Sequence, residues 1–204
     1  GFMYNIKNIK AALTDKTKGI ILNSPNNPTG GMASQKLLEE IADVAIERDL
    51  FVISDEVYEK LVYDDNKHIS IYTLPGMAER TIVINSFSKS YAMTGWRIGY
   101  AVANGRVMKN MVKLKELEAS CTNVPAQFAA LAALRGPQLC IKAMLTEYKR
   151  RRQIMISGLN SIPGISCAYP KGTFYAFANI KELGISSDEL CNRLMDEAGV
   201  VVVP

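Results

Sequence analysis

Polar side chains able to do chemistry follow three short apolar runs of this 204-residue sequence. They supply an amide, a carboxylate, a phenol, two hydroxyls, an amine and a guanidinium, in the order Asn27, Asp55, Tyr58, Ser86, Ser88, Lys89 and Arg97. An amine that adds to an aldehyde, a carboxylate for a ring nitrogen and donors for a phosphate are what a phosphorylated pyridine aldehyde needs. The combination therefore predicts a binding site for such a molecule.

Each of these residues also has an ordinary structural explanation when it is taken alone. A single lysine in a loop is usually a surface residue, and Asp55 after an apolar strand is more often the N-cap of a helix. The segment at residues 27–30, Asn-Pro-Thr-Gly, predicts only a turn. The chemical interpretation depends on polar groups occurring together after three strands, which packing does not explain.

The apolar runs alternate with longer segments of helical periodicity. This pattern predicts strands at residues 19–22, 50–53, 81–84 and 98–102, and helices at 34–48, 106–118, 126–134 and 141–159. The rhythm of strand, helix and strand is typical of the α/β class and predicts a three-layer α/β/α arrangement around a largely parallel sheet. Ligands bind beyond the carboxyl ends of the strands in such sheets, which is where the polar side chains fall.

The pattern changes after Pro163. Residues 173–180 and 200–203 predict strands, and residues 187–198 between them predict a helix. These elements indicate the start of a small α+β C-terminal domain. We therefore expect a partial large domain at residues 1–136, followed at 137–204 by a long linking helix and an incomplete small domain.

Composition narrows the class of protein. The 48% hydrophobic and 22% charged residues are ordinary globular values, and no apolar run approaches the length of a membrane span. Four widely spaced cysteines and a single histidine predict reduced thiols, no metal site and a cytoplasmic protein. The densest basic run, at residues 149–152, has no interleaved aromatic residues, so it predicts a solvated helix face and no nucleic-acid partner.

Consecutive segments with the same order and spacing resemble the signatures of fold-type I aminotransferases, which use pyridoxal phosphate. The segments are SPNNPTG at residues 24–30, SDEVY at 54–58, and SFSK at 86–89 followed by MTGWRIGY at 93–100. The likeness is greatest to the aspartate aminotransferase-like branch. It implies the large domain of a pyridoxal-phosphate-dependent transferase, and exchange of an amino group between an amino acid, aspartate by family default, and a 2-oxo acid such as 2-oxoglutarate.

The resemblance also implies roles for individual residues. Lys89 resembles the lysine that forms the Schiff base with pyridoxal phosphate and then carries the proton. Asp55 resembles the carboxylate that pairs with the pyridine nitrogen. Tyr58 and Asn27 resemble the donors to the ring's phenolic oxygen. We therefore expect Lys89, Asp55 and Tyr58 to be catalytic.

Further expectations concern the phosphate and the rest of the molecule. Arg97, Ser86 and Ser88 resemble the residues that hold the phosphate, for which a planar guanidinium is well suited. The resemblance implies a homodimer with small-molecule substrates, and no membrane partner. Because family members are longer than this chain, we expect an internal fragment that is inactive by itself. A ring-stacking aromatic residue would precede Gly1, and an arginine that binds the substrate carboxylate would follow Pro204.

Other functions stay open at this point. A β-eliminating carbon–sulfur lyase or a cyclopropane-carboxylate synthase shares the fold, although the sequence MTGWR at residues 93–97 favours the aminotransferase. The third candidate is the pyridoxal-phosphate-binding effector domain of a transcription regulator. Its DNA-binding module would lie before Gly1.

Overall fold

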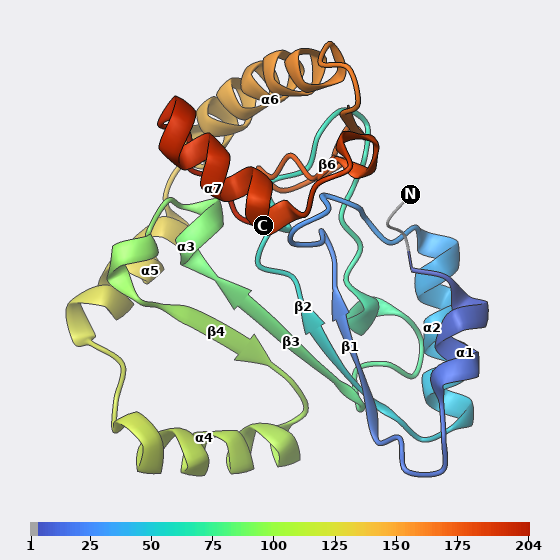
Figure 1. Cartoon of the computed structure of the whole chain (residues 1–204). Coiled ribbons are helices and arrows are strands. Elements are labelled where there is room, and N and C mark those ends of the chain that lie inside the picture. Colours follow the sequence, from blue (N-terminus) through green and yellow to red (C-terminus); the bar gives the residue numbers. More distant parts are fainter. Residues whose placement is uncertain (1–3) are drawn as a thin grey trace.

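The computed structural model describes residues 4–204 as a four-stranded sheet flanked by helices, with a separate two-stranded sheet (Figure 1). The larger sheet has the order β1 (Gly19–Asn23), β2 (Phe51–Asp55), β3 (Thr81–Ser86) and β4 (Gly99–Val102). The first three strands are parallel, and β4 is antiparallel to β3. The predicted α/β class with a largely parallel sheet is confirmed, as are the strands predicted around these positions.

One face of this sheet carries the main core. Helix α2 (Gln35–Glu47) begins at Ser34, whose hydroxyl accepts a hydrogen bond from the backbone of Leu37 at 3.3 Å. Its apolar face packs on the strands, and Ile41 at its centre is fully buried. The cluster comprises Leu22, Leu37, Leu38, Ile41, Ala42, Ala45, Leu50, Val52, Ile71 and Met77. Burial of this apolar surface is the main source of stability on this side of the sheet.

The opposite face of β1 and β2 is open in the described chain. Ile21 and Ile53 are partners in the strand register, and Ile21 is 74% exposed. Phe51 and Ile53 are exposed as well. Parallel strands are usually covered on both faces, so this is a bare apolar surface.

Beyond β3 the chain reverses direction through short helices. Helix α3 (Phe87–Ser90) and the 3₁₀ turn η2 (Thr94–Trp96) lead into β4. A glycine is needed at the start of β4, because a Cβ atom on Gly99 would lie 2.6 Å from the carbonyl oxygen of Asn85. A second core cluster forms here against helix α5 (Val124–Arg135); its buried members are Phe87, Met93, Ile98, Ala126 and Ala130.

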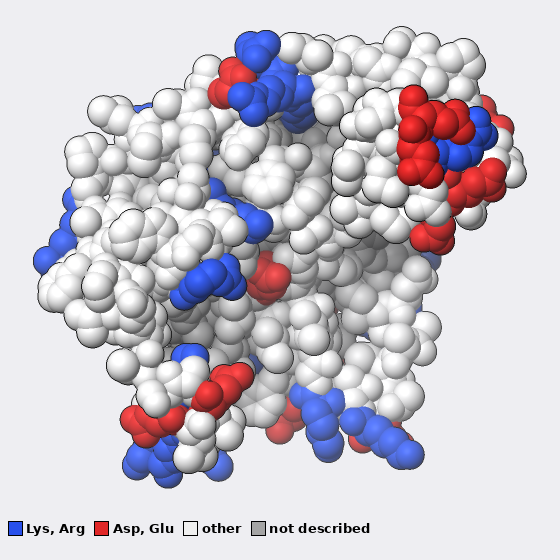
Figure 2. All heavy atoms as spheres, turned by 60° about the vertical axis from the view of Figure 1, so that its left-hand side comes forward, with Lys and Arg blue, Asp and Glu red and all other residues white. Residues whose placement is uncertain are grey.

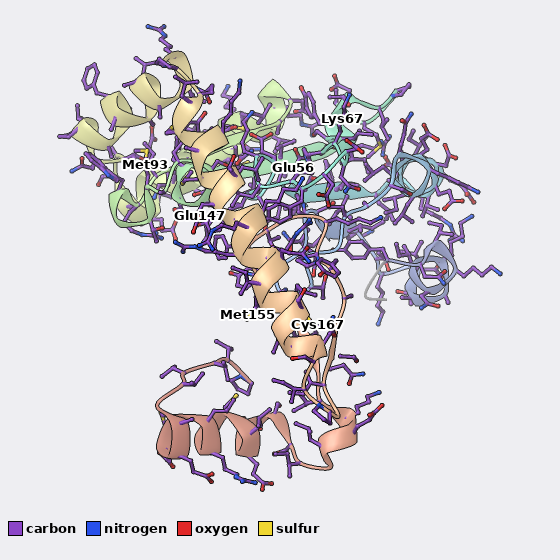
Figure 3. All side chains as sticks on the ribbon, turned by 90° about the horizontal axis from the view of Figure 1, so that it is seen from above. Glu56, Lys67, Met93, Glu147, Met155 and Cys167 are labelled. Carbon is purple, nitrogen blue, oxygen red and sulfur yellow. The ribbon has the colours of Figure 1, made fainter. Side chains whose placement is uncertain are left out.

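Three helices lack buried residues, although Ile6 and Ile9 of the first one pack against the main core cluster. α1 (Ile6–Ala12), α4 (Gly105–Ala119) and α7 (Ser187–Ala198) have no buried residue. Figure 1 shows α4 lying away from the sheet, and Figure 3 shows α7 set apart from the main body beyond the end of α6 (Leu139–Asn160). The five helices α2, α4, α5, α6 and α7 nevertheless lie where the periodicity predicts them.

Two predicted strands near the C-terminus are wrong. Of residues 173–180 only β6 (Ala178–Asn179) is a strand, paired with β5 (Ser166–Cys167). The start of that run instead hydrogen-bonds to loops of the large sheet. Residues 200–203 form no strand, and Val203 is 91% exposed. A β-strand needs a neighbouring strand, and none lies beside this run among residues 4–204.

The basic run on α6 is only partly a solvated face. Arg150 and Arg151 are exposed and bind Glu147, as predicted for such a face. Arg152 contradicts the prediction, because its side chain is only 10% exposed. It lies 4.4 Å from the centre of the Tyr63 ring and pairs with Asp64 at 2.8 Å. The run is therefore largely engaged within the chain.

Two further observations concern the whole described chain. Among its residues no single helix is long and apolar enough to cross a membrane; only α5 and α6 together, with a bend of 80° between them, meet that length and composition. All four cysteines are free thiols.

Candidate active site

The carboxyl ends of β1, β2 and β3 lie at one level. The strand register pairs Asn23 with Asp55, and Asp55 with Ile84. The loop that carries Asn27, the turn that carries Tyr58 and the short helix that carries Lys89 therefore leave the sheet from the same end. This is the arrangement that the sequence predicts.

The last residue of β1 ties the first two of these segments together. The side-chain oxygen of Asn23 accepts the backbone N–H of Asn27 at 2.7 Å, and its amide nitrogen donates to the carbonyl oxygen of Asp55 at 3.3 Å. The backbone N–H of Ser24 donates to the same carbonyl at 3.2 Å. The side chain of Asn27 is exposed above this junction. The sequence motifs do not predict Asn23 as a site residue, although an amide at the end of a predicted strand is a recognisable signal.

Asp55 begins the turn that brings Tyr58 under the site. One oxygen of the Asp55 carboxylate accepts the backbone N–H of Val57 at 3.2 Å. The Tyr58 side chain is buried, and its hydroxyl lies 2.9 Å from that of Tyr175. Burial above all, and then the hydrogen bond with Tyr175 and the charge of Asp55, raise the pKa of Tyr58 well above the usual phenol value. The Tyr58 hydroxyl is therefore protonated and able to donate.

Phe174 connects Tyr58 with the predicted catalytic lysine. The Nζ atom of Lys89 lies 5.4 Å from the centre of the Phe174 ring, a distance at which a cation is attracted to the ring face. The same ring meets Tyr58 edge-on, with 5.5 Å between ring centres. The sequence does not predict Phe174 and Tyr175 as site residues, because the pattern at residues 173–180 is typical of a strand. Two adjacent aromatic residues just after Gly172 were the available signal.

Residues 170–175, which we call the 170–175 segment, are bound to two loops at this end of the sheet. The backbone N–H groups of Lys171 and Gly172 donate to the carbonyl of Gly30 at 2.9 and 3.1 Å. The N–H of Thr173 donates to Leu61 at 2.8 Å, and the Tyr63 hydroxyl donates to the Thr173 carbonyl. These contacts hold Phe174 and Tyr175 against the site.

The predicted phosphate-binding residues lie together on the turn between β3 and β4. The hydroxyl of Ser86 accepts the N–H of Ser88 at 3.1 Å and donates to the carbonyl of Ile98 at 3.3 Å. Arg97 is exposed, has a left-handed backbone with φ of 51°, and donates to the carbonyl of Thr94 at 3.0 Å. The hydroxyl of Thr94 donates to the carbonyl of Ser88 at 3.1 Å, which links the two ends of the turn.

A buried carboxylate lies behind the site. Glu56, labelled in Figure 3, accepts hydrogen bonds from the hydroxyls of Ser54 at 2.8 Å and Ser70 at 2.7 Å, and pairs with His68 at 2.9 Å. Burial acts to raise the pKa of Glu56, but hydrogen bonds from His68, Ser70 and Ser54 and the charge of His68 outweigh it and hold the pKa below its ordinary value. Ligand atoms of Glu56, Glu59 and His68 lie within 4.8 Å of one another. Because both oxygens of Glu56 already have partners, we interpret the group as a hydrogen-bond network.

The surface over these elements is hollowed. Figure 2 shows acidic and basic side chains beside a recess near the middle of the view, while most charges lie at the margins. A hollow of about 320 Å³ lies against the 170–175 segment; it is lined by aromatic and basic side chains, among them Tyr63, Tyr148, Arg151, Arg152, Phe174 and Tyr175. None of the predicted cofactor-binding residues lines this hollow, so it is distinct from the group at the carboxyl ends of the strands.

Comparison with known proteins gives a consistent result. The family described as aminotransferase class I and II matches residues 1–204. An aspartate aminotransferase of Pyrococcus abyssi is 47% identical over the whole chain, and the aromatic-amino-acid aminotransferase 2 of Thermococcus litoralis is 45% identical; the chain covers 52% of each. The crystal structure of an aromatic aminotransferase from Pyrococcus horikoshii superposes with a TM-score of 0.96 at 45% identity, over 100% of this chain and 55% of that one.

The chain thus spans about half the length of the curated relatives it matches. The relatives named above are aminotransferases. They give no support to the carbon–sulfur lyase, the cyclopropane-carboxylate synthase or the transcription regulator that the sequence leaves open.

Proposed function

The chain belongs to the class I and II aminotransferases, and from this premise we propose that the complete protein is a pyridoxal-phosphate-dependent transaminase. It exchanges the amino group of an amino acid with the oxo group of a 2-oxo acid. The fold, a mostly parallel sheet with flanking helices, is that of the large domain in this class of enzyme. Lys89 is the residue that we propose to hold the cofactor.

The side chains at the carboxyl end of the sheet fit pyridoxal phosphate by their chemistry. The cofactor has an aldehyde, a pyridine nitrogen, a phenolic oxygen and a phosphate. An amine, a carboxylate, protonated donors and a guanidinium with hydroxyls are the matching groups. They come from Lys89, Asp55, Tyr58 with Asn27, and Arg97 with Ser86 and Ser88. Each of these four groups of the cofactor thus has a partner of suitable type in the chain.

The chain's own residues have distinct tasks in this reaction. The Nζ atom of Lys89 would hold the cofactor through its aldehyde carbon, and as a free amine it would move the proton at the substrate's α-carbon. The carboxylate of Asp55 keeps a proton on the ring nitrogen. When bound, pyridoxal phosphate supplies an electron sink for the negative charge that develops at the α-carbon. Tyr58 donates to the phenolic oxygen, and Arg97 neutralises the phosphate.

The substrates follow from what all transaminations share. We propose an amino acid as donor and a 2-oxo acid such as 2-oxoglutarate as acceptor. Two of the named relatives carry the names aspartate and aromatic-amino-acid aminotransferase, which makes these two amino-acid classes the first to assay. We further propose a homodimer located in the cytoplasm.

One observation carries the proposal: Lys89 and Tyr58, which follow adjacent strands, both contact the Phe174 ring, and Asp55 lies near Tyr58. Lys89 Nζ lies 5.4 Å from the Phe174 ring, Tyr58 contacts that ring, and the Asp55 charge acts on Tyr58. Surface lysines that serve only solubility have no such surroundings. The arrangement supports a lysine that meets a ligand.

The experiment is to trap the cofactor on the protein. The complete gene product is incubated with pyridoxal phosphate, reduced with sodium borohydride and mapped by peptide mass spectrometry. We expect the pyridoxyl group on Lys89, and its loss in Lys89→Ala. Lys67→Ala changes an exposed lysine and should leave the labelling intact. Labelling of another lysine in place of Lys89 would refute the assignment.

A further inference from the structure

Two tyrosine hydroxyls from distant parts of the chain meet beneath the proposed site. Tyr58 and Tyr175 are 117 positions apart, and their hydroxyl oxygens lie 2.9 Å from each other. Their rings meet nearly edge-on at a distance of 5.9 Å between centres. We propose that Tyr175 is a positioning residue: its hydroxyl donates to the oxygen of Tyr58, so that the hydrogen of Tyr58 is free for the cofactor's phenolic oxygen. This inference rests on the proposed function of the site.

The argument begins with the hydrogen count of a phenol. Each tyrosine hydroxyl has one hydrogen to donate and lone pairs that accept. If Tyr58 donates to Tyr175, it has no hydrogen left for a ligand. If Tyr175 donates to Tyr58, both hydrogens point the same way along a chain of two bonds. Bonds in such a chain polarise and strengthen one another, so Tyr175 makes Tyr58 a better donor.

The backbone holds both hydroxyls in place. The N–H of Tyr175 donates to the hydroxyl of Thr173 at 3.2 Å, and Thr173 is fully buried. The N–H of Thr173 donates to the carbonyl of Leu61, whose own N–H donates to the carbonyl of Tyr58. Backbone hydrogen bonds therefore attach both tyrosines to the turn at residues 58–61. The contact between their hydroxyls does not depend on the rotamer of an exposed side chain.

The electrostatic surroundings agree with a donating Tyr58. Burial first, then Tyr175 and the carboxylate of Asp55, raise the pKa of Tyr58. Lys89 lies 5.4 Å from the centre of the Phe174 ring, which in turn meets Tyr58 edge-on. Tyr58 is therefore protonated at neutral pH. The hydrogen bond donated by Tyr175 determines the direction in which the Tyr58 hydrogen points.

The test follows protonation of the Lys89–cofactor linkage by its visible absorbance as a function of pH. It uses the complete gene product loaded with pyridoxal phosphate. In Tyr175→Phe we expect the apparent pKa of the linkage to rise by roughly half to one unit, the equivalent of one neutral hydrogen bond. Weaker donation from Tyr58 leaves more negative charge on the phenolic oxygen, and this favours the protonated linkage. Tyr58→Phe should shift the pKa further in the same direction.

A matched control separates this effect from general loss of a hydroxyl. Tyr169 also lies in the C-terminal region and its hydroxyl is 3.2 Å from that of Ser157, on the surface. Tyr169→Phe should leave the linkage pKa unchanged. An equal shift in Tyr169→Phe would overturn the inference.

The double variant tests whether Tyr175 acts through Tyr58. If it does, Tyr58→Phe with Tyr175→Phe should titrate like Tyr58→Phe alone, whereas independent effects would add. Additive shifts, or no shift in Tyr175→Phe, would overturn the role of Tyr175. Borohydride labelling of the same samples keeps the two proposals apart. Labelled Lys89 with an unchanged linkage pKa refutes only the inference, and absence of a Lys89 label refutes the proposed function and the inference with it.

Discussion

Between the carboxyl end of the sheet and helix α4, the chain changes from close packing to almost complete exposure. At the sheet end, side chains and backbone groups of four segments satisfy one another, and residues as polar as Ser54, Glu56 and Thr173 are buried. In α4 no residue is buried, and Leu117 is 86% exposed. Both regions come from sequences with the expected local pattern.

The difference shows which part of the architecture this chain determines by itself. The residues proposed to bind the cofactor are positioned by hydrogen bonds and packing between parts of the same chain. The apolar face of α4 and the open face around Ile21 and Ile53 have no such contacts. Four measurements, arranged from the largest expected effect to the smallest, can break or sharpen this comparison.

The first measurement compares an apolar side chain of the packed core with an apolar side chain of α4. Ile41→Ala leaves a cavity under α2 and should lower the free energy of unfolding by about 2–5 kcal/mol. Leu117→Ala removes a side chain that is 86% exposed and should change it by less than about 0.5 kcal/mol. Urea unfolding of the chain followed by circular dichroism gives both values. Equal losses would mean that α4 is packed in solution and that the contrast is false.

The second measurement tests whether the carboxyl end of the sheet contains the residues needed for turnover. Asp55→Ala in the complete gene product should lower turnover about 10²–10³-fold, because the lost charge acts mainly in the transition state. Binding of pyridoxal phosphate should persist. Asp43→Ala, which removes an exposed carboxylate from α2, should leave turnover unchanged. A raised Michaelis constant with intact turnover in Asp55→Ala would assign Asp55 another task.

The third measurement loosens the attachment of the 170–175 segment. Gly30 has φ of 66°, and a Cβ atom there would lie 2.2 Å from the Cβ of Pro170. Gly30→Ala should therefore cost about 1–3 kcal/mol of stability and displace Phe174 and Tyr175. Gly184→Ala is the matched control, since its φ is 70° but nothing lies within 4 Å. If both variants lose equal stability, backbone strain alone explains the loss and the contact with Pro170 contributes nothing.

The fourth measurement uses acid. The folded-state pKa of Glu56 is lowered from its ordinary value, so its contribution to stability is complete above the ordinary carboxyl pKa and is lost as the pH falls through the folded-state pKa. The stability difference between wild type and Glu56→Gln should be about 1–2 kcal/mol at pH 7 and should shrink at pH 3 to 4. Urea midpoints at both pH values measure it. Glu59→Gln serves as the neighbouring control, and a difference for Glu56→Gln that is constant with pH would contradict the shift.

The sequence alone predicts most of the sheet end, for a physical reason. Short apolar runs can be buried only as strands of a covered sheet, and the polar residue after each run then falls at the strand's end. The positions of Asp55 and Lys89 are predicted in this way, and their proposed roles come from the resemblance of the surrounding motifs to a known family. The local pattern therefore predicts where these side chains lie, and their chemistry stays a proposal.

The local sequence pattern does not predict that the 170–175 segment packs against the site. The apolar alternation at residues 173–180 predicts a strand. The backbone N–H groups of Gly172 and Thr173 instead donate hydrogen bonds to the carbonyls of Gly30 and Leu61. Those partners lie more than a hundred positions away, and nothing in the immediate sequence names them. For this reason the sequence does not predict Tyr175 as a site residue. The run at residues 200–203 fails as a strand because β-propensity describes a residue's fit to a sheet and cannot supply one.

The contacts of the 170–175 segment also bear on when the site is completed during synthesis. The hydrogen bond between Tyr58 and Tyr175 closes a loop of 117 positions, and the bond between Tyr63 and Thr173 closes one of 110. Long closures form late in folding, and the ribosome delivers the N-terminal residues first. All four strands of the large sheet, and Lys89 with them, are thus made before Phe174 and Tyr175 leave the ribosome. A nascent chain that has reached residue 150 already contains the amine of Lys89, but Phe174, which packs beside it, and Tyr175 have yet to be translated.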